Sequence, residues 1–370
     1  MSPHPSDEET PEPKDGRKRG GLSTRSIAWI VVTLLFAAMG GLSILSAPDG
    51  EAPGQAGFPA FDLQGHRGAR GLAPENSLPG VEAALAVGVT TLELDVVLTR
   101  DGIPVVHHDR RLDPDRTRRG GAFLDPAAEP PAVLSLGLSD LAAYDVGRLR
   151  PDSPVAERFP EQQGLDGVAI PTLAVLLERA EALSGGRLRY NIETKISPLD
   201  PAGSAAPEAI VEAVLETLRA AGVEQRAAIQ SFDWRSLQAV REQAPDIVTV
   251  HLSAEQSWLD TVERGRDGAS PWLGGADIDA FEGSLPKAVL AAGGAVWSPF
   301  YRDLRAADLS EARRLGLRVV VWTVNDPADM ASLIDLGVDG IITDYPDRLR
   351  AVMEAKGLAL PPRFPTAAAE

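Results

Sequence analysis

Three short strings carry side chains that could do metal and phosphate chemistry. They are His66-Arg67-Gly68, Glu93-Leu94-Asp95 and His107-His108-Asp109. The chain contains 5 histidines, and three of them fall inside these strings beside carboxylates. Groups that bind metals and transfer protons are concentrated here, which indicates a catalytic site.

Glu93 and Asp95 lie two residues apart in the apolar stretch 91–97. In a β-strand both carboxylates point to one face, while Leu92 and Leu94 point to the other. Two like charges in one small volume repel each other unless a cation or a proton neutralises them. Hard divalent cations prefer carboxylate oxygens, so the pair predicts a Ca²⁺ or Mg²⁺ site. The competing interpretation is an exposed strand with an acidic face, and the neighbouring histidines argue against it.

His66 and His108 are predicted to form a general acid/base pair. A neutral imidazole can remove a proton from an attacking oxygen, and a protonated one can give a proton to a leaving oxygen. Arg67 and Lys195 are the nearby cations that could hold a phosphate group and offset its developing charge. His107 is expected to be a bystander, because adjacent residues in an extended segment face opposite ways.

Composition limits the classes of partner and site. Of 370 residues, 44% are hydrophobic and 24% are charged, which is typical of a globular chain with a large core. Acidic residues outnumber basic ones, 53 against 36, and the formal net charge of -17 argues against nucleic acid as a partner. The chain has no cysteine, which excludes disulfides, thiolate metal sites and cysteine nucleophiles.

The N-terminal segment predicts a single-pass membrane anchor. Residues 26–47 carry no charge and are long enough to span a bilayer. Basic residues precede them, so the disordered tail 1–25 is expected in the cytoplasm and the catalytic domain outside it, periplasmic or extracellular. Residues 48–60, rich in Pro and Gly, form the expected linker. A cleaved signal peptide is the alternative and would make the protein secreted, but its apolar stretch is usually ~7–15 residues long.

From residue 61 onward, short apolar runs alternate with amphipathic stretches. Eight strands separated by helices predict a (β/α)8 TIM barrel over 61–356, followed by a tail over 357–370. A doubly wound parallel sheet is the alternative, because the pattern alone does not show closure. The expected strands are 61–65, 91–97, 189–193, 227–231, 247–252, 295–298, 318–323 and 340–343. The expected helices are 78–87, 207–221, 234–242, 285–292, 304–315 and 327–336.

The stretch 113–170 does not fit a regular βα unit. It contains Gly120-Gly121 and Pro130-Pro131, and a short helix is expected over 139–144. Insertions of this length beside an active face often cover that face. The stretch therefore predicts an inserted cap or subdomain.

The barrel prediction also brings the candidate residues together. His66 follows the first strand, and Glu93 and Asp95 lie at the end of the second. Glu193 ends the third strand, and Asp344 follows the eighth. The carboxyl ends of all barrel strands meet at one rim, so these five side chains are expected to converge there.

Further strings resemble the glycerophosphodiester phosphodiesterase family. The stretch His66-Arg67-Gly68-Ala69-Arg70-Gly71-Leu72-Ala73-Pro74-Glu75-Asn76-Ser77 is similar to the opening signature of that family. The other matches follow in chain order from about residue 61 to 349. They are Glu93-Leu94-Asp95-Val96, Thr99-Arg100-Asp101-Gly102, Val105-Val106-His107-His108-Asp109, Ile170-Pro171-Thr172-Leu173, Asn191-Ile192-Glu193-Thr194-Lys195, Gln230-Ser231-Phe232, Trp322-Thr323-Val324-Asn325 and Asp339-Gly340-Ile341-Ile342-Thr343-Asp344-Tyr345-Pro346.

The resemblance implies a (β/α)8 barrel that hydrolyses small glycerophosphodiesters to sn-glycerol 3-phosphate and an alcohol. It also implies attack by the substrate's own glycerol hydroxyl through a cyclic phosphate, which water later opens. The residues that it carries over are the acid/base pair His66 and His108, the metal ligands Glu93, Asp95 and Glu193, the phosphate-binding Arg67 and Lys195, and Trp322, which is either barrel packing or a wall of the substrate pocket.

One departure from the family pattern concerns substrate preference. After His108-Asp109 the family often has a compact Leu-x-Arg-Thr, whereas here Asp113-Pro114-Asp115 separates Leu112 from Arg116-Thr117. A related enzyme with lysophospholipase D or phospholipase-like activity on lysophospholipids is therefore an alternative. A noncatalytic binding protein is less favoured, because every candidate residue is present. A metal site with oxygen ligands in an exported domain favours Ca²⁺ as the cofactor, and Mg²⁺ or Mn²⁺ suit the same ligands.

Overall fold

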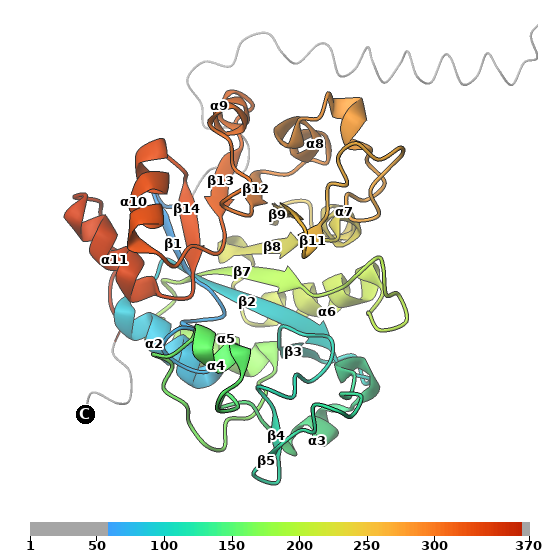
Figure 1. Cartoon of the computed structure of the whole chain (residues 1–370), viewed down its shortest axis with the longest axis vertical. Helices are drawn as coiled ribbons and strands as arrows, with labels where there is room; N and C mark the ends of the chain where they lie inside the picture. The colour runs from blue at the N-terminus through green and yellow to red at the C-terminus, as the bar shows by residue number, and fades with distance from the viewer. Residues whose placement is uncertain (1–57, 365–370) are drawn as a thin grey trace, which may run out of the picture. The chain divides into compact units, whose positions relative to one another are not determined.

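The computed structural model describes residues 58–364, which form a closed barrel of parallel strands with a helix after each strand (Figure 1). One 9-stranded sheet contains eight parallel strands and the antiparallel β3 (Pro104–Val106). The first two parallel strands also pair with each other, Gln64 beside Thr91, and this pairing closes the sheet. Closure confirms the predicted barrel and excludes the doubly wound sheet. The barrel strands are β1 (Asp62–Gly65), β2 (Thr91–Leu98), β7 (Arg189–Thr194), β8 (Ala227–Ser231), β9 (Val248–Ser253), β12 (Val296–Pro299), β13 (Arg318–Val321) and β14 (Gly340–Thr343).

Capping residues next to the barrel helices set where these helices begin and end. Ser77, Thr172 and Asp326 each accept hydrogen bonds from backbone amides in the first turn of the helix that they precede. Gly88 and Gly337 end two helices in the left-handed conformation that glycine tolerates best. The barrel helices are α2 (Leu78–Val87), α5 (Leu173–Ser184), α6 (Pro207–Ala220), α7 (Trp234–Gln243), α8 (Leu285–Ala291), α9 (Ala306–Arg314), α10 (Pro327–Leu336) and α11 (Pro346–Ala355).

Two of these helices, α5 and α11, are absent from the elements expected from the sequence. Each begins beside a proline, Pro171 before the cap of α5 and Pro346 in the first turn of α11. Proline is the usual signal of a turn, yet it is also tolerated at a helix start, where its missing amide has no partner to lose. The predicted strand 318–323 is too long, because β13 ends at Val321.

Between β2 and α5 the chain builds an inserted subdomain with a small core of its own. In Figure 1 its strands and α3 lie on one side of the barrel strands. The helix predicted over 139–144 is wrong at its C-terminal end, because Tyr144 pairs with Arg119 as a strand residue. The core contains Val97, Val105, Leu112, Val133, Leu141, Tyr144 and Ile170. The elements are β4 (Arg118–Arg119), β5 (Ala122–Phe123), η1 (Val133–Ser135), α3 (Leu138–Leu141), β6 (Tyr144–Asp145) and α4 (Pro154–Arg158).

A second long connection, between β9 and α8, is not expected from the sequence. It contains a two-stranded hairpin in which Gln256 pairs with Leu259. Trp258 lies in the turn of this hairpin and is 59% exposed. The elements of this connection are β10 (Glu255–Gln256), β11 (Leu259–Asp260) and η3 (Ile278–Phe281), and a further short helix, η2 (Glu224–Arg226), precedes β8.

A chain of buried amides crosses the barrel interior below the rim. Asn191 donates from Nδ2 to Gln64 Oε1 and to Gln230 Oε1, both at 2.9 Å. Gln230 Nε2 donates in turn to Glu93 Oε1 at 2.7 Å, and Gln64 Nε2 donates to Asp62 Oδ2 at 2.8 Å. Buried polar groups require partners, and the amide nitrogens of Asn191, Gln64 and Gln230 all donate, whereas Asn191 Oδ1 has no partner among the described residues. The position of Glu93 is therefore set from inside the barrel.

The predicted transmembrane helix over 26–47 and the tail 1–25 lie outside the described residues. The linker and the C-terminal tail are described only from residue 58 and as far as residue 364. Phe364 is buried, and its amide donates to Leu85 O of α2 at 3.0 Å. Within 58–364, no helix combines the length and the apolar character that crossing a membrane requires.

Candidate active site

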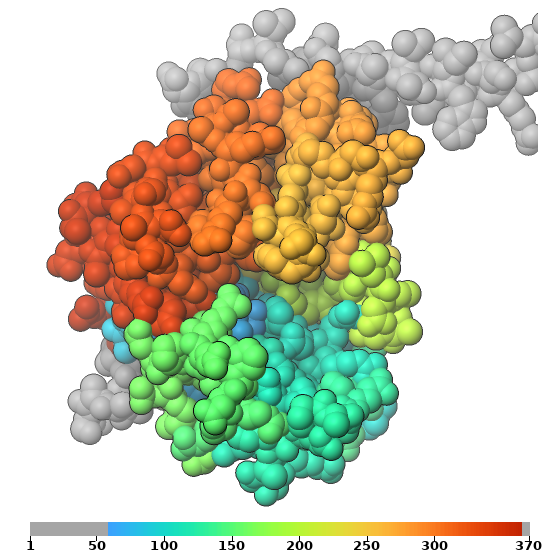
Figure 2. Space-filling model, viewed as in Figure 1, coloured from blue at the N-terminus to red at the C-terminus, as the bar shows by residue number. Residues whose placement is uncertain are grey.

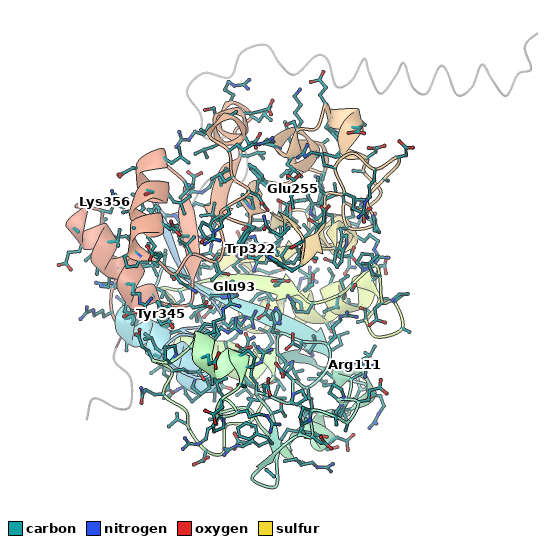
Figure 3. All side chains as sticks on the ribbon, in the orientation of Figure 1. Glu93, Arg111, Glu255, Trp322, Tyr345 and Lys356 are labelled. Atoms are coloured by element: carbon teal, nitrogen blue, oxygen red, sulfur yellow. The ribbon has the colours of Figure 1, made fainter. Side chains whose placement is uncertain are left out.

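A cavity of about 810 Å³ lies among the loops that follow the carboxyl ends of the barrel strands. Figure 2 shows this face of the molecule, with the inserted subdomain below and the later βα connections above. In Figure 3, Glu93 and Trp322 lie near the centre of the same view, and both line the cavity. The predicted site residues that line it are His66, Arg67, Glu93, His108, Glu193, Lys195 and Trp322.

Glu93, Asp95 and Glu193 form a buried acidic cluster, which we call the acidic triad. One oxygen of each lies within 4.8 Å of one oxygen of the others. β2 pairs with β7 in the register that sets Asp95 beside Glu193. Burial raises the pKa of Glu93 well above its usual value and the pKa of Glu193 to about 7, and the neighbouring carboxylates add to both effects.

The acidic triad fits a hard divalent cation. Asp95 Oδ1 is buried and has no hydrogen-bond partner among the described residues. Its other oxygen, Oδ2, accepts from Asn76 Nδ2 at 2.8 Å and lies 3.2 Å from Arg67 Nε. The nearest cation to Asp95 Oδ1, Lys195 Nζ, lies 3.7 Å away, beyond hydrogen-bonding distance. A buried carboxylate oxygen that accepts no hydrogen bond is costly beside two other carboxylates, and oxygen donors of this kind are the ligands of Ca²⁺ and Mg²⁺.

Each predicted catalytic histidine is held by a carboxylate. His66 Nδ1 lies 2.6 Å from Asp344 Oδ1, and His108 Nδ1 lies 2.7 Å from Asp109 Oδ1. Because a carboxylate only accepts, Nδ1 carries the proton and Nε2 is left with the lone pair. Burial lowers the pKa of both imidazoles, and nearby cations lower that of His108 further, to about 3. Both rings are neutral at neutral pH in this arrangement and can accept a proton.

His107 has a different environment from its neighbour. Its Nδ1 contacts the carbonyl oxygen of Asp109 at 2.7 Å. The ring lies against a small separate cavity that Glu75 and Arg116 also line, and it is not among the residues that line the main cavity. The structure thus places His108, but not His107, in the candidate site.

The two predicted phosphate-binding cations lie beside the acidic triad. Lys195 Nζ is 2.6 Å from Glu193 Oε1 and 3.7 Å from Asp95 Oδ1. The backbone amide of Arg67 donates to Glu93 Oε2 at 2.9 Å, and its guanidinium donates to Glu75 Oε1 at 2.8 Å. Arg67 has a left-handed backbone with φ of 52°, which lets both its amide and its side chain face the carboxylates.

A model of the glycerophosphoryl diester phosphodiesterase family matches residues 66–348. The chain belongs to this family. It is thus an enzyme, a phosphoric diester hydrolase, and the resemblance noted from its motifs is confirmed. The matched residues begin at His66 and include every element that contributes to the cavity.

Individual family members agree with this assignment. A glycerophosphodiester phosphodiesterase of Bacillus subtilis is 29% identical over 292 residues, which cover 78% of this chain and 84% of that protein. A crystal structure from Silicibacter pomeroyi, provisionally named a glycerophosphoryl diester phosphodiesterase, is 37% identical with a TM-score of 0.72, over 81% of this chain and 95% of that one. An Oleispira antarctica phosphodiesterase, crystallised in complex with the product sn-glycerol-3-phosphate, shares the fold at 22% identity and a TM-score of 0.57, over 80% of this chain and 97% of that one.

Arg116, which the sequence indicated only as part of the altered loop after His108, contacts two carboxylates of the site. Its guanidinium donates to Glu75 Oε1 at 2.8 Å and to Asp109 Oδ2 at 2.6 Å. It also pairs with Asp113 Oδ2 at 2.6 Å, one of the residues that lengthen the loop after His108. Arg116 therefore connects the inserted subdomain to the carboxylate that orients His108.

Aromatic side chains form the other wall of the cavity. Trp322, the only one predicted, donates from Nε1 to Ser298 O at 2.9 Å and contacts Phe232 edge to face at 5.2 Å between ring centres. Phe300 and Trp258 continue the wall outward. Trp258 could not be found from the motifs, because it lies in the β10–β11 hairpin, whose approach to the cavity depends on tertiary contacts.

Replacing Arg116 by Met should destabilise the protein and lower its activity together. The change leaves Glu75 and Asp109 without one of their cations, and losing one partner of a largely buried ion pair costs about 3 kcal/mol. Urea denaturation and glycerophosphodiester turnover measure the two effects. Arg100→Met is the control beside the same subdomain, because Arg100 does not line the cavity and both Arg100 and its ion-pair partner Asp140 are exposed, and it should change stability by less than about 1 kcal/mol. Equal effects of the two variants would contradict this role of Arg116.

Proposed function

We propose that this chain hydrolyses glycerophosphodiesters to sn-glycerol 3-phosphate and an alcohol in a metal-dependent reaction. The observation that carries the proposal is the pair of carboxylate-held imidazoles, His66 and His108, at the acidic triad. Two neutral bases beside a cation site match the needs of phosphodiester cleavage, in which one oxygen loses a proton and another gains one. The family relationship and the complex of the Oleispira antarctica protein with its product sn-glycerol-3-phosphate support the same reaction.

Glu93, Asp95 and Glu193 would hold the divalent cation. When bound, the cation offsets negative charge on the phosphate and orients it. We propose Ca²⁺ as the favoured ion because the chain is expected to be exported, while Mg²⁺ and Mn²⁺ suit the same oxygens.

The histidines move the protons. The Nε2 atom of one ring accepts the proton of the attacking hydroxyl, while Asp344 or Asp109 stabilises the imidazolium that forms. The other ring, once protonated, gives its proton to the leaving alcohol. The attacking group is proposed to be the glycerol hydroxyl of the substrate, which makes a cyclic phosphate that water opens with the roles of the two rings reversed.

Lys195 and Arg67 bind the phosphate. Lys195 is largely buried and lies 2.6 Å from Glu193 of the acidic triad, so its charge acts at short range on a phosphate bound there. The guanidinium of Arg67 is shared with Glu75 and Asp95, and the same contacts keep it extended toward the cavity.

Chelation should abolish the activity, and one added metal should restore it. The assay follows release of sn-glycerol 3-phosphate from glycerophosphocholine, glycerophosphoethanolamine and glycerophosphoglycerol after EDTA treatment and after addition of Ca²⁺, Mg²⁺ or Mn²⁺. Glu193→Gln removes one ligand charge and should weaken metal binding by at least tenfold in calorimetry. If the metal-loaded protein leaves all three substrates intact, the proposed function is wrong.

Separate substitutions of the adjacent residues His107 and His108 test which of the two takes part in catalysis. His108→Ala should lower turnover by about 100-fold or more, because the acid/base group is lost while the fold and the acidic triad remain. His107→Ala is the matched control and should keep turnover within a few-fold of the parent chain. Circular dichroism and metal calorimetry check that both variants are folded and bind metal. Unchanged turnover of His108→Ala would remove this residue from the mechanism.

We further propose that residues 26–47 anchor the protein in a membrane, with the barrel outside the cytoplasm. Their uncharged, apolar composition and the preceding basic residues support this location. The full chain should stay in the membrane fraction after carbonate and high-salt washes, whereas a chain starting at residue 48 should be recovered in the soluble fraction. Recovery of the full-length, uncleaved chain as soluble protein would refute the anchor.

A further inference from the structure

Two arginine side chains that line the cavity stack on one aromatic ring. The ring is that of Phe159, which follows α4 of the inserted subdomain and is buried. The guanidinium carbon of Arg70 lies 4.3 Å from the centre of the ring, and that of Arg158 lies 5.4 Å from it. We call Arg70 and Arg158 the arginine pair. Because both side chains line the cavity, their N–H donors are available to a molecule bound there.

Hydrogen bonds tie the segment after α4 to the loop that carries Arg70. Gln162 donates from Nε2 to the carbonyl oxygen of Arg70 at 2.7 Å. The amide of Arg70 donates in turn to the carbonyl oxygen of His66 at 3.3 Å. The inserted subdomain therefore places Arg158 on the side of the cavity that contains His66. These contacts join protein groups alone, so the arginine pair is arranged before any ligand binds.

Arg70 is buried and has donors that the protein does not use. The residue is 7% exposed. Its Nε lies 2.5 Å from Glu75 Oε2, but neither Nη atom donates a hydrogen bond to any residue within 58–364. Burial lowers the pKa of Arg70 to about 10, and the charge of Arg67 adds to this effect, while Glu75 opposes it. The guanidinium therefore lacks counter-charge, which a bound anion would supply.

Arg158 is the cation of the cavity lining that has no carboxylate partner among residues 58–364. It stacks on Phe159 and takes part in no ion pair there. The other cations of the lining all pair with acidic residues, and they are Arg67, Arg70, Arg110, Arg111 and Lys195. The charge of Arg158 thus stays available to an anionic ligand.

We propose that the arginine pair binds a second anionic group of the substrate, a carboxylate or a phosphate carried by the headgroup alcohol. The phosphodiester itself lies at His66, His108 and the acidic triad, where Lys195 and a divalent cation meet its single negative charge. The guanidinium donors of the arginine pair match a different acceptor, because planar guanidinium groups bind carboxylate and phosphate oxygens through two parallel hydrogen bonds. This inference rests on the proposed function and names a class of headgroup for the same site.

Glycerophosphoserine and glycerophosphoethanolamine test the proposal, because they differ only in the carboxylate of the headgroup. Release of sn-glycerol 3-phosphate from each substrate is measured with the full chain saturated with metal, at low ionic strength. We expect kcat/KM to be at least about tenfold higher for glycerophosphoserine, since a hydrogen bond between charged groups contributes about this factor.

Arg158→Gln should lower the ratio of the two kcat/KM values by about tenfold, through slower turnover of glycerophosphoserine alone. Arg158 is exposed and lies in no ion pair within 58–364, so this variant should keep its fold. Arg158→Lys keeps the charge and should keep a higher ratio than Arg158→Gln. Arg119→Gln is the matched control, because Arg119 is also exposed and stacks 5.4 Å from the centre of the Tyr144 ring in the same subdomain, but does not line the cavity. It should leave the ratio unchanged.

Three results would overturn the anionic subsite and leave the proposed function standing. Glycerophosphoethanolamine could be hydrolysed as efficiently as glycerophosphoserine, or Arg158→Gln could leave the ratio unchanged. Arg158→Gln could also lower both kcat/KM values equally, which would assign Arg158 to the part of the substrate that the two compounds share. If the metal-loaded chain hydrolyses neither substrate, both proposals are wrong.

Discussion

Three carboxylates lie close together at the rim of the barrel, and the electrostatic repulsion between them determines which groups must surround them. Glu93, Asp95 and Glu193 are all buried, so their mutual repulsion is weakly screened. Each carboxylate has at least one oxygen fixed by a neighbour: Glu93 by Gln230, Asp95 by Asn76 and Glu193 by Lys195. These contacts hold the three carboxylates close together, in an arrangement that could hold a divalent cation as the counter-charge.

Charges of alternating sign surround the acidic triad. Glu75 is buried among Arg67, Arg70 and Arg116, and these cations outweigh the effect of burial and hold its pKa well below the usual value. The same network holds Asp109, and through it the orientation of His108. Because a lone buried charge is far more costly than a paired one, each charge in this network depends on its partners for its stability.

The two halves of the barrel contribute different surfaces to the cavity. The strands β1, β2 and β7, together with the inserted subdomain, supply the charged residues. The connections after β8, β9, β12 and β13 supply Phe232, Trp258, Phe300 and Trp322. One half therefore carries the charged groups of the proposed reaction, and the other lines the same cavity with aromatic side chains.

The sequence alone determined the features that depend on local spacing. A period of two set Glu93 and Asp95 on one face of a strand. The repetition of apolar runs predicted seven of the eight barrel strands to within one residue at each end, and the eighth, 318–323, is two residues too long. The sequence did not predict α5, α11 or the β10–β11 hairpin, because proline occurs both in turns and at helix starts and because short irregular segments have no clear periodicity. The sequence placed His66 and Asp344 at one rim, but only the tertiary structure showed that their side chains are in hydrogen-bonding contact across 278 residues of sequence. Only the tertiary structure joined Arg116 to Asp109 and Glu75 and brought Trp258 to the cavity. Local patterns report the periodicity of one segment, whereas these contacts exist because closing the barrel brings the ends of distant strands to a single rim.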